Sequence, residues 1–160
     1  MTEERFSATG RGSTLMLVDD DPDDLWIFGH LLQRACPWPD RFTLVKAVDG
    51  VQALARVEAA VAAKSPLPDL ILLDMNMPGL SGLDVLRMMR ASAALADTPI
   101  LILSTASNRE AADEALRHGA DAVITKPDSM HSIAELASTI FRTWLGNRPP
   151  LHRDPHRASA

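Results

Sequence analysis

Cysteine, tyrosine and long apolar runs are scarce or missing in this chain of 160 residues. Its single cysteine is Cys36, and it has no tyrosine. One cysteine cannot form an internal disulfide, which is typical of a protein kept in a reducing compartment. No apolar run approaches the roughly 20 residues that a membrane-spanning helix needs, and residues 1–12 lack the apolar segment of a secretory signal. The sequence therefore predicts a cytoplasmic protein with no membrane partner.

Positive charge is also in short supply. The chain has 16 Lys and Arg against 21 Asp and Glu, a net charge of −5, without any basic run. Because binding to nucleic acid relies on a basic surface, we expect no nucleic-acid partner. The hydrophobic fraction of 46% and the charged fraction of 23% are typical of one soluble globular domain. We expect this domain over residues 14–146, with a flexible N-terminus at 1–13 and a disordered, Pro- and Arg-rich tail at 147–160.

Short apolar runs alternate with helical patterns along the predicted domain. The runs that read as buried strands are 14–18, 42–48, 70–73, 100–103 and 122–125. The residues that cap the intervening helices are Asp21, Asp49, Ser81 and Ser107, and Gly119 marks a helix end; a last helix begins at about Ser129. Asp23 and Asp24 fall in the first turn of the first helix, where the helix dipole favours acids. About five strands alternating with about five helices predict an α/β fold with a parallel sheet covered on both faces.

Polar side chains follow four of the predicted strands at the point where each ends. They are Asp19 and Asp20 after the first strand, Asp74 after the third, Ser104 after the fourth and Lys126 after the fifth. Right-handed crossovers make all strands point the same way, so these residues share one edge, where open α/β sheets place their ligands. Each residue alone has an ordinary explanation as a turn, a cap or a solvated side chain. Together they form a complementary set of carboxylates, a hydroxyl and an ammonium.

Carboxylates gathered in this way predict a particular chemistry. Three of them close together repel one another and raise each other's pKa values, so they are stable as anions only beside a cation. Mg²⁺ is the natural candidate, because it takes one or two carboxylates, waters and a phosphate. Lys126 can pair with Asp74 or with an incoming phosphoryl group, to which Ser104 can donate a hydrogen bond. An acid, a metal ion, a lysine and a hydroxyl are the groups that phosphoryl transfer requires.

The order and spacing of these motifs resemble the receiver domain of two-component response regulators over residues 14–145. The motifs are Asp19-Asp20, Asp74 with Met77-Pro78-Gly79, Ser104, and Lys126-Pro127. The resemblance implies a flavodoxin-like, doubly wound (βα)5 fold with strand order 2-1-3-4-5. It also implies a protein that signals by docking, since residues 147–160 are too few and too irregular to form an effector domain. We therefore expect a stand-alone receiver.

The resemblance assigns roles to the polar residues at the sheet edge. Asp74 would accept a phosphoryl group from the phosphohistidine of a sensor kinase. Lys126 would hold that group, with the Lys126–Pro127 peptide in the cis form. Ser104 would swing toward phosphorylated Asp74 and move its loop. The protein would catalyse its own phosphorylation and slow dephosphorylation, and would not otherwise be an enzyme.

The same resemblance implies a Mg²⁺ site. Asp20 would bind the ion directly, Asp19 through a water molecule and Asn76 through its main-chain carbonyl oxygen, and Asp74 would be a further ligand. One departure concerns the switch, because Val123 stands where many receivers carry Tyr or Phe. With valine at this position, the chain lacks the aromatic side chain whose change of rotamer is part of the usual switch.

Finer features of the sequence predict the partners. The Asp-Pro-Asp-Asp opening of the first helix, the Asp49-Gly50 turn and the Trp144-Leu145 ending resemble single-domain regulators of phytochrome-type kinases. A bacteriophytochrome kinase is therefore the expected partner. Phe141, Trp144 and Leu145 extend past the expected end of the core, either as a hydrophobic cap on it or as an exposed patch. We predict a homodimer through this C-terminal helix.

Two other functions remain open on the sequence alone. The main alternative is a Mg²⁺-dependent phosphatase with an aspartate nucleophile. Phosphatases of that class carry an Asp-x-Asp motif, in which the second acid protonates the leaving group. In this chain Asn76 stands at the position of the second acid, and an amide cannot donate that proton. The third possibility is a binding module that works without phosphate, against which the complete acidic set argues.

Overall fold

The computed structural model describes residues 12–77, 79–105 and 109–145. The predicted flexible N-terminus and disordered tail lie almost entirely outside the described residues, and so does the predicted capping residue Ser107. Those predictions therefore stay predictions. Within the described residues, no helix is long and apolar enough to cross a membrane.

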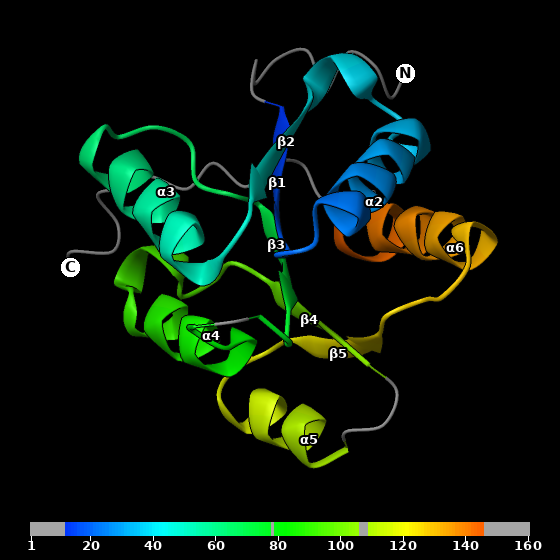
Figure 1. The fold of residues 1–160 in the computed structure, drawn as a ribbon. Coiled ribbons are helices and arrows are strands. Elements are labelled where there is room, and N and C mark those ends of the chain that lie inside the picture. Colours follow the sequence, from blue (N-terminus) through cyan, green and yellow to red (C-terminus); the bar gives the residue numbers. More distant parts are fainter. Residues whose placement is uncertain (1–11, 78, 106–108, 146–160) are drawn as a thin grey trace.

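A parallel sheet of five strands forms the centre of the molecule (Figure 1). The strands are β1 (Ser13–Val18), β2 (Phe42–Ala47), β3 (Leu70–Asp74), β4 (Ile100–Ser104) and β5 (Ala122–Thr125). Their order is β2-β1-β3-β4-β5, which confirms the predicted fold class and strand order. In the register of the sheet, Val18 lies opposite Ala47 on one side and Leu73 on the other. The ends of β1 and β3 are therefore neighbours.

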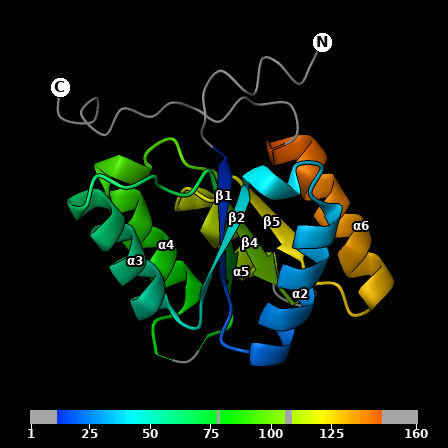
Figure 2. The same cartoon turned by 90° about the horizontal axis from the view of Figure 1, so that it is seen from above.

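Helices cover both faces of the sheet. They are α2 (Pro22–Ala35), α3 (Gly50–Ala62), α4 (Gly82–Ala91), α5 (Arg109–Arg117) and α6 (Met130–Ile140), with short helical turns at Pro39–Arg41, Ala93–Leu95 and Phe141–Leu145. Figures 1 and 2 show α2 and α6 on one face, and α3 and α4 on the other. α5 completes the second face through Ala115, which packs in the same apolar cluster as α3 and α4. This is the doubly wound arrangement.

The sheet divides the core into two halves. Successive side chains of a strand point to opposite faces. Met16, Ile71 and Ile102 pack toward α3 and α4, whereas Leu15 and Leu72 pack toward α2 and α6. β3 and β4 are buried along their whole length, so both faces of these strands are apolar up to their last residues, Asp74 and Ser104. This explains why they read as continuous apolar runs in the sequence.

Polar caps fix where the helices begin. The side chains of the predicted caps Asp21, Asp49 and Ser81 accept hydrogen bonds from main-chain N–H groups two or three residues ahead. Ser129, at the expected start of the last helix, caps it in the same way. Gly119 has a φ of 101°, which favours glycine, and it follows the end of α5 as predicted. Because these helices start just after a strand ends, the caps also fix the loops at the carboxyl edge of the sheet.

The chain continues from α6 into a π-helical turn at Phe141–Leu145. Phe141 and Leu145 are buried on the α2 side of the sheet, and the Phe141 ring packs edge-on against Phe42 with the ring centroids 5.2 Å apart. Trp144 is half-buried. Of the two possibilities left open by the sequence, the hydrophobic cap is correct for Phe141 and Leu145. This finding does not test the predicted dimer, but Phe141 and Leu145 are buried and so cannot form an exposed patch for it.

Candidate functional site

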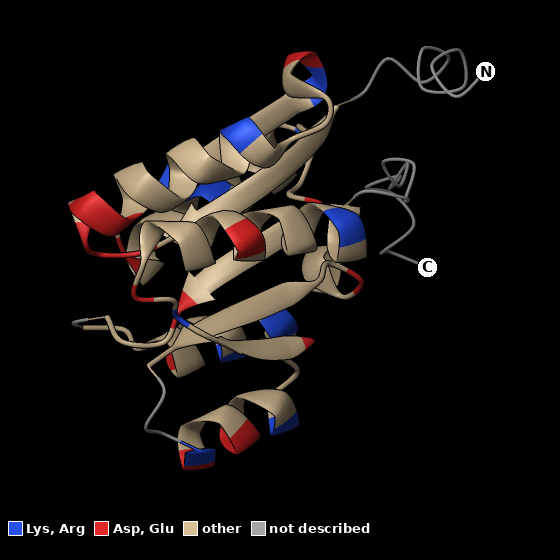
Figure 3. Ribbon diagram, turned by 90° about the vertical axis from the view of Figure 1, so that its right-hand side faces the viewer, with Lys and Arg blue, Asp and Glu red and all other residues tan. Residues whose placement is uncertain are grey.

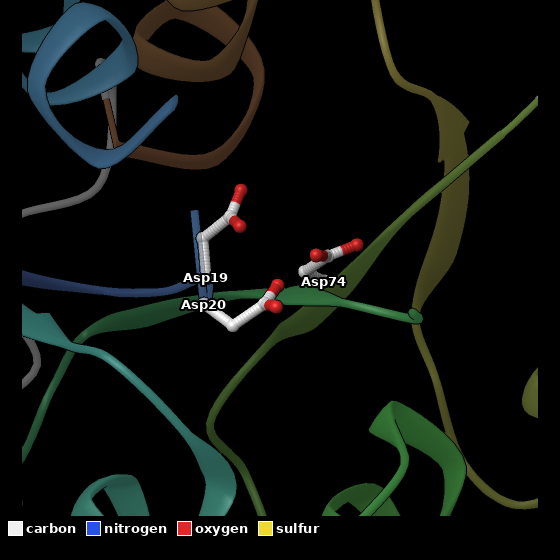
Figure 4. A group of neighbouring side chains, drawn as sticks. All are labelled: Asp19, Asp20 and Asp74. Atoms are coloured by element: carbon white, nitrogen blue, oxygen red, sulfur yellow. The ribbon is translucent and has the colours of Figure 1, made fainter. Parts of the chain in front are cut away.

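Three carboxylates meet where β1 and β3 end. Asp19 and Asp20 directly follow β1, and Asp74 is the last residue of β3. One carboxylate oxygen from each lies within 4.8 Å of the others, and Figure 4 shows the three groups gathered beside the two strand ends. Asp19 and Asp74 are only 3% and 4% exposed, whereas Asp20 is open to solvent. Close oxygen ligands with one open side suit a hard divalent cation that keeps some of its water.

Asp74 is held in an unfavourable environment for a negative charge. Burial raises the pKa of Asp74 to about 6, and the charge of Asp19 adds to this effect. The main-chain N–H of Asn76, which donates to Asp74 Oδ1 at 3.2 Å, and the ammonium of Lys126 act in the opposite direction without cancelling it. A bound cation would favour the ionised carboxylate that a nucleophile must be.

Asp19 is oriented by three contacts at the turn between β1 and α2. Its main-chain N–H donates to Ala47 O at 3.1 Å, which extends the pairing of β1 with β2. Its carboxylate accepts from the N–H of Asp21 through Oδ1 at 3.0 Å and from Lys126 Nζ through Oδ2 at 2.8 Å. The carboxylate is therefore fixed toward the interior of the site.

Lys126 is the cation that the structure places among these acids. Its Nζ lies 2.8 Å from Asp19 Oδ2, 2.7 Å from Asp24 Oδ2 and 3.8 Å from Asp74 Oδ2. Burial alone would lower the pKa of Lys126, but the hydrogen bonds to Asp19 and Asp24 outweigh burial and raise it. Lys126 therefore stays charged at any physiological pH.

Sequence reasoning missed the part that Asp24 has in this site. It identified Asp24 only as an acid favoured by the helix dipole, yet the side chain reaches Lys126 from the first turn of α2. Among the described residues, the site thus holds four carboxylates (Asp19, Asp20, Asp24 and Asp74) and one ammonium. Figure 3 shows the acidic positions gathered at the edge where β1 passes into α2. These carboxylate oxygens are the kind of ligand that a divalent cation prefers, and the site has more negative than positive charge for such a cation to balance.

Ser104 is the last residue of β4, the strand that pairs with β3. Its side chain is buried, its Oγ donates to Thr105 O at 3.3 Å, and its carbonyl oxygen accepts the main-chain N–H of Lys126 at 2.7 Å. The serine and the lysine are therefore tied together through the backbone. The structure thus brings Asp19, Asp20, Asp74, Ser104 and Lys126 to one edge, as predicted. The predicted swing of Ser104 is not tested.

The predicted cis form of the Lys126–Pro127 peptide is wrong. No peptide bond among the described residues is cis. Proline reduces the preference for the trans form to about 0.5–1 kcal/mol without reversing it, so a proline after the strand is not enough to predict a cis bond. Val123, which occupies the position of the missing aromatic residue, is half-buried on β5 and packs on the α3 and α4 side of the sheet.

The fold and the acidic site can now be compared with known proteins. Residues 15–138 match the family described as the response regulator receiver domain. The chain belongs to this family. It is therefore a receiver of two-component signalling, and the strand ends described above are those of a receiver.

Individual relatives support the assignment. The probable transcriptional regulatory protein TcrX of Mycobacterium tuberculosis is 30% identical over 139 residues, which cover 86% of this chain and 54% of TcrX. This receiver thus spans about half the length of that curated relative. Among solved structures, the phosphorylated cyanobacterial phytochrome response regulator RcpA has a TM-score of 0.77 at 26% identity, covering 86% of this chain and 96% of RcpA. The Mn²⁺-bound form of response regulator Rcp1 has a TM-score of 0.72 at 25% identity, covering 85% and 96%.

Proposed function

We propose that this receiver accepts a phosphoryl group on Asp74 from a sensor histidine kinase, in a reaction that depends on Mg²⁺. The observation that carries the proposal is the burial of Asp74 beside Asp19, with the pKa of Asp74 raised and Lys126 as the nearby ammonium. A site with an excess of acids is suited to a divalent cation and to a group whose negative charge that cation neutralises.

The geometry distinguishes the two oxygens of Asp74. Oδ1 accepts the main-chain N–H of Asn76, whereas Oδ2 is the oxygen 3.8 Å from Lys126 Nζ. We assign Oδ2 as the attacking atom. It forms a bond to phosphorus while the bond from phosphorus to the histidine nitrogen breaks, and the electron pair of that bond returns to the imidazole. Lys126 then holds an oxygen of the transferred group.

Asp19, Asp20, Asp74 and the main-chain carbonyl of Asn76 are the proposed ligands of the cation. When bound, Mg²⁺ supplies the positive charge that neutralises the carboxylates and the phosphoryl oxygens. Ser104, whose hydroxyl donates to Thr105 O in this structure, would turn to donate to a phosphoryl oxygen instead. The loop after β4 would follow and change a docking surface. With Val123 in place of an aromatic residue, this hydroxyl is the group left to drive the switch.

The proposed partner is a phytochrome-type kinase in the cytoplasm. The support for it is the likeness of this chain to RcpA, a cyanobacterial phytochrome response regulator, together with the Asp-Pro-Asp-Asp opening of α2 and the Trp144-Leu145 ending. Homodimerisation through the C-terminal helix remains part of the proposal, with half-buried Trp144 as the apolar residue left to form it.

Mass spectrometry of the intact protein tests the function directly. Incubation with acetyl phosphate and Mg²⁺ should add one phosphoryl group per chain, and Asp74→Asn should abolish the adduct. Asp40→Asn, which removes the same charge from an exposed turn before β2, should leave it unchanged. Fast hydrolysis of many phosphomonoesters without a lasting adduct would instead favour the phosphatase. Asn76 argues against that outcome, because an amide cannot protonate a leaving group.

A further inference from the structure

The ion pair between Asp24 and Lys126 is the contact in the site that the proposed function does not use. Asp24 Oδ2 lies 2.7 Å from Lys126 Nζ, the shortest of the three Lys126 ion pairs. Asp24 comes from α2, whereas Asp74 comes from β3. The ammonium is therefore shared between a helix on one side and the phosphoacceptor strand on the other.

Hydrogen-bond geometry shows which side holds the ammonium. A lysine ammonium has three N–H donors. Two oxygens, Asp19 Oδ2 at 2.8 Å and Asp24 Oδ2 at 2.7 Å, are within hydrogen-bond distance of Lys126 Nζ. Asp74 Oδ2, at 3.8 Å, is beyond the range of a hydrogen bond. Lys126 is thus engaged by the two acids of the β1–α2 segment more closely than by the acceptor.

The attraction between Asp24 and Lys126 also affects how Lys126 can meet a phosphoryl group. The side chain of Asp24 is 38% exposed and that of Lys126 is 21% exposed, so their attraction is only partly weakened by water. A phosphoryl group on Asp74 brings oxygens that need the same ammonium. Lys126 Nζ lies 3.8 Å from Asp74 Oδ2, so it must leave its present position beside Asp24 to reach that group, and the two therefore compete for the position of the ammonium.

We propose that Asp24 is a positioning residue that holds Lys126 toward α2 and so slows phosphorylation of Asp74. This inference rests on the proposed function. In the reaction with acetyl phosphate, Asp74 Oδ2 bonds to phosphorus, the bond from phosphorus to the acetyl oxygen breaks, and acetate leaves with the electron pair. The ammonium must turn from Asp24 to the phosphoryl oxygens as this occurs. Weakening its hold on Asp24 lowers the barrier.

Replacement of Asp24 tests the proposal. Asp24→Asn keeps the shape of the side chain and removes its charge, and we expect the rate of adduct formation with acetyl phosphate and Mg²⁺ to rise about two- to fivefold, the range for partly exposed ion pairs. Asp24→Glu, which keeps the charge, should stay near the wild-type rate. Asp23→Asn is the matched control, because Asp23 is an exposed acid in the same first turn. Thermal unfolding checks that every variant is folded.

A second background separates positioning from a general effect of charge. In a Lys126→Gln protein, Asp24→Asn should no longer accelerate the reaction, because the group through which it acts is gone. Equal acceleration by Asp23→Asn and Asp24→Asn, or a slower reaction in Asp24→Asn, would overturn the inference while the proposed function stands. A wild-type protein that gains no phosphoryl group would overturn both.

Discussion

The two edges of the sheet use the same residue type in opposite ways. At the amino edge, Asp121 accepts from Arg90 Nη2 and from the N–H of Ile100, each at 2.8 Å, and Asp69 accepts from the N–H of Thr14 at 2.8 Å. Each of these acids has donors of its own. At the carboxyl edge, Asp19, Asp24 and Asp74 share the ammonium of Lys126, and Asp20 lies beside Asp19 and Asp74. The difference teaches that the amino edge contributes to stability, whereas the carboxyl edge keeps an excess of charge that costs stability and suits a ligand.

Arg90 should show the largest effect at the amino edge. Its guanidinium donates to the carbonyl oxygens of Gly119, Leu95 and Thr98 at 2.8–2.9 Å and pairs with Asp121, so it joins α4 to the turns before β4 and β5. Arg90→Met would leave these acceptors without their donor. We expect a loss of about 2–4 kcal/mol in the free energy of unfolding, measured with urea. A loss below 1 kcal/mol would remove the contrast between the edges.

The same change at the two edges should have opposite signs. Asp74→Asn removes a buried charge that folding disfavours and should stabilise the metal-free protein by about 1–3 kcal/mol at pH 8. Asp121→Asn weakens a charge-assisted pair with Arg90 and should destabilise it by about 1 kcal/mol. Urea unfolding of the two variants side by side gives the comparison. If both variants lost stability, the carboxyl edge would not be the strained one.

The pH dependence should show the strain at Asp74 separately. Its pKa of about 6 in the folded protein is above the usual 3.8, so protonation favours folding. The stabilisation from this group is fully present below about pH 4 and is lost as the pH rises through about 6. The stability of wild type relative to Asp74→Asn should therefore fall between these values and then level off. A difference that does not change with pH would show that Asp74 ionises normally.

Added Mg²⁺ should have the smallest effect on stability, and the pH dependence of this effect follows from the ionisation of Asp74. Mg²⁺ prefers the ionised carboxylate, so at pH 5 it must displace a proton from Asp74, whereas at pH 8 it relieves the repulsion directly. Added MgCl₂ should raise the melting temperature more at pH 8 than at pH 5, by the amount that ligand binding adds to stability. The Asp74→Asn protein should show a weaker and less pH-dependent shift. Equal shifts at both pH values would separate the cation from Asp74.

Much of this arrangement could be predicted because it depends on local patterns. β3 and β4 are enclosed on both faces, so they read as apolar runs, and the predicted start of each matches the structure. The alternation of strands and helices then placed Asp74 and Lys126 at one edge without any knowledge of side-chain contacts. The direction of all five strands was enough.

What could not be predicted depends on how elements turn toward each other. Asp24 in the first turn of α2 reaches Lys126 just after β5, and Arg90 reaches Asp121 across 31 positions of the chain. Neither pair has a spacing that a sequence pattern could reveal. The burial of Phe141 was left open because the apolar spacing did not show that the chain continues into a π-helical turn packed on the sheet. The trans peptide before Pro127 was missed because its energy difference is small.

The complete enclosure of β3 has a mechanical consequence. A strand with close-packed neighbours on both faces and hydrogen-bonded neighbours on both edges cannot shift when a bulky dianion arrives at its tip. Any displacement that the proposed phosphorylation causes must be taken up by the segments beyond the strand ends, so the change would leave the site through loops while the sheet stays still.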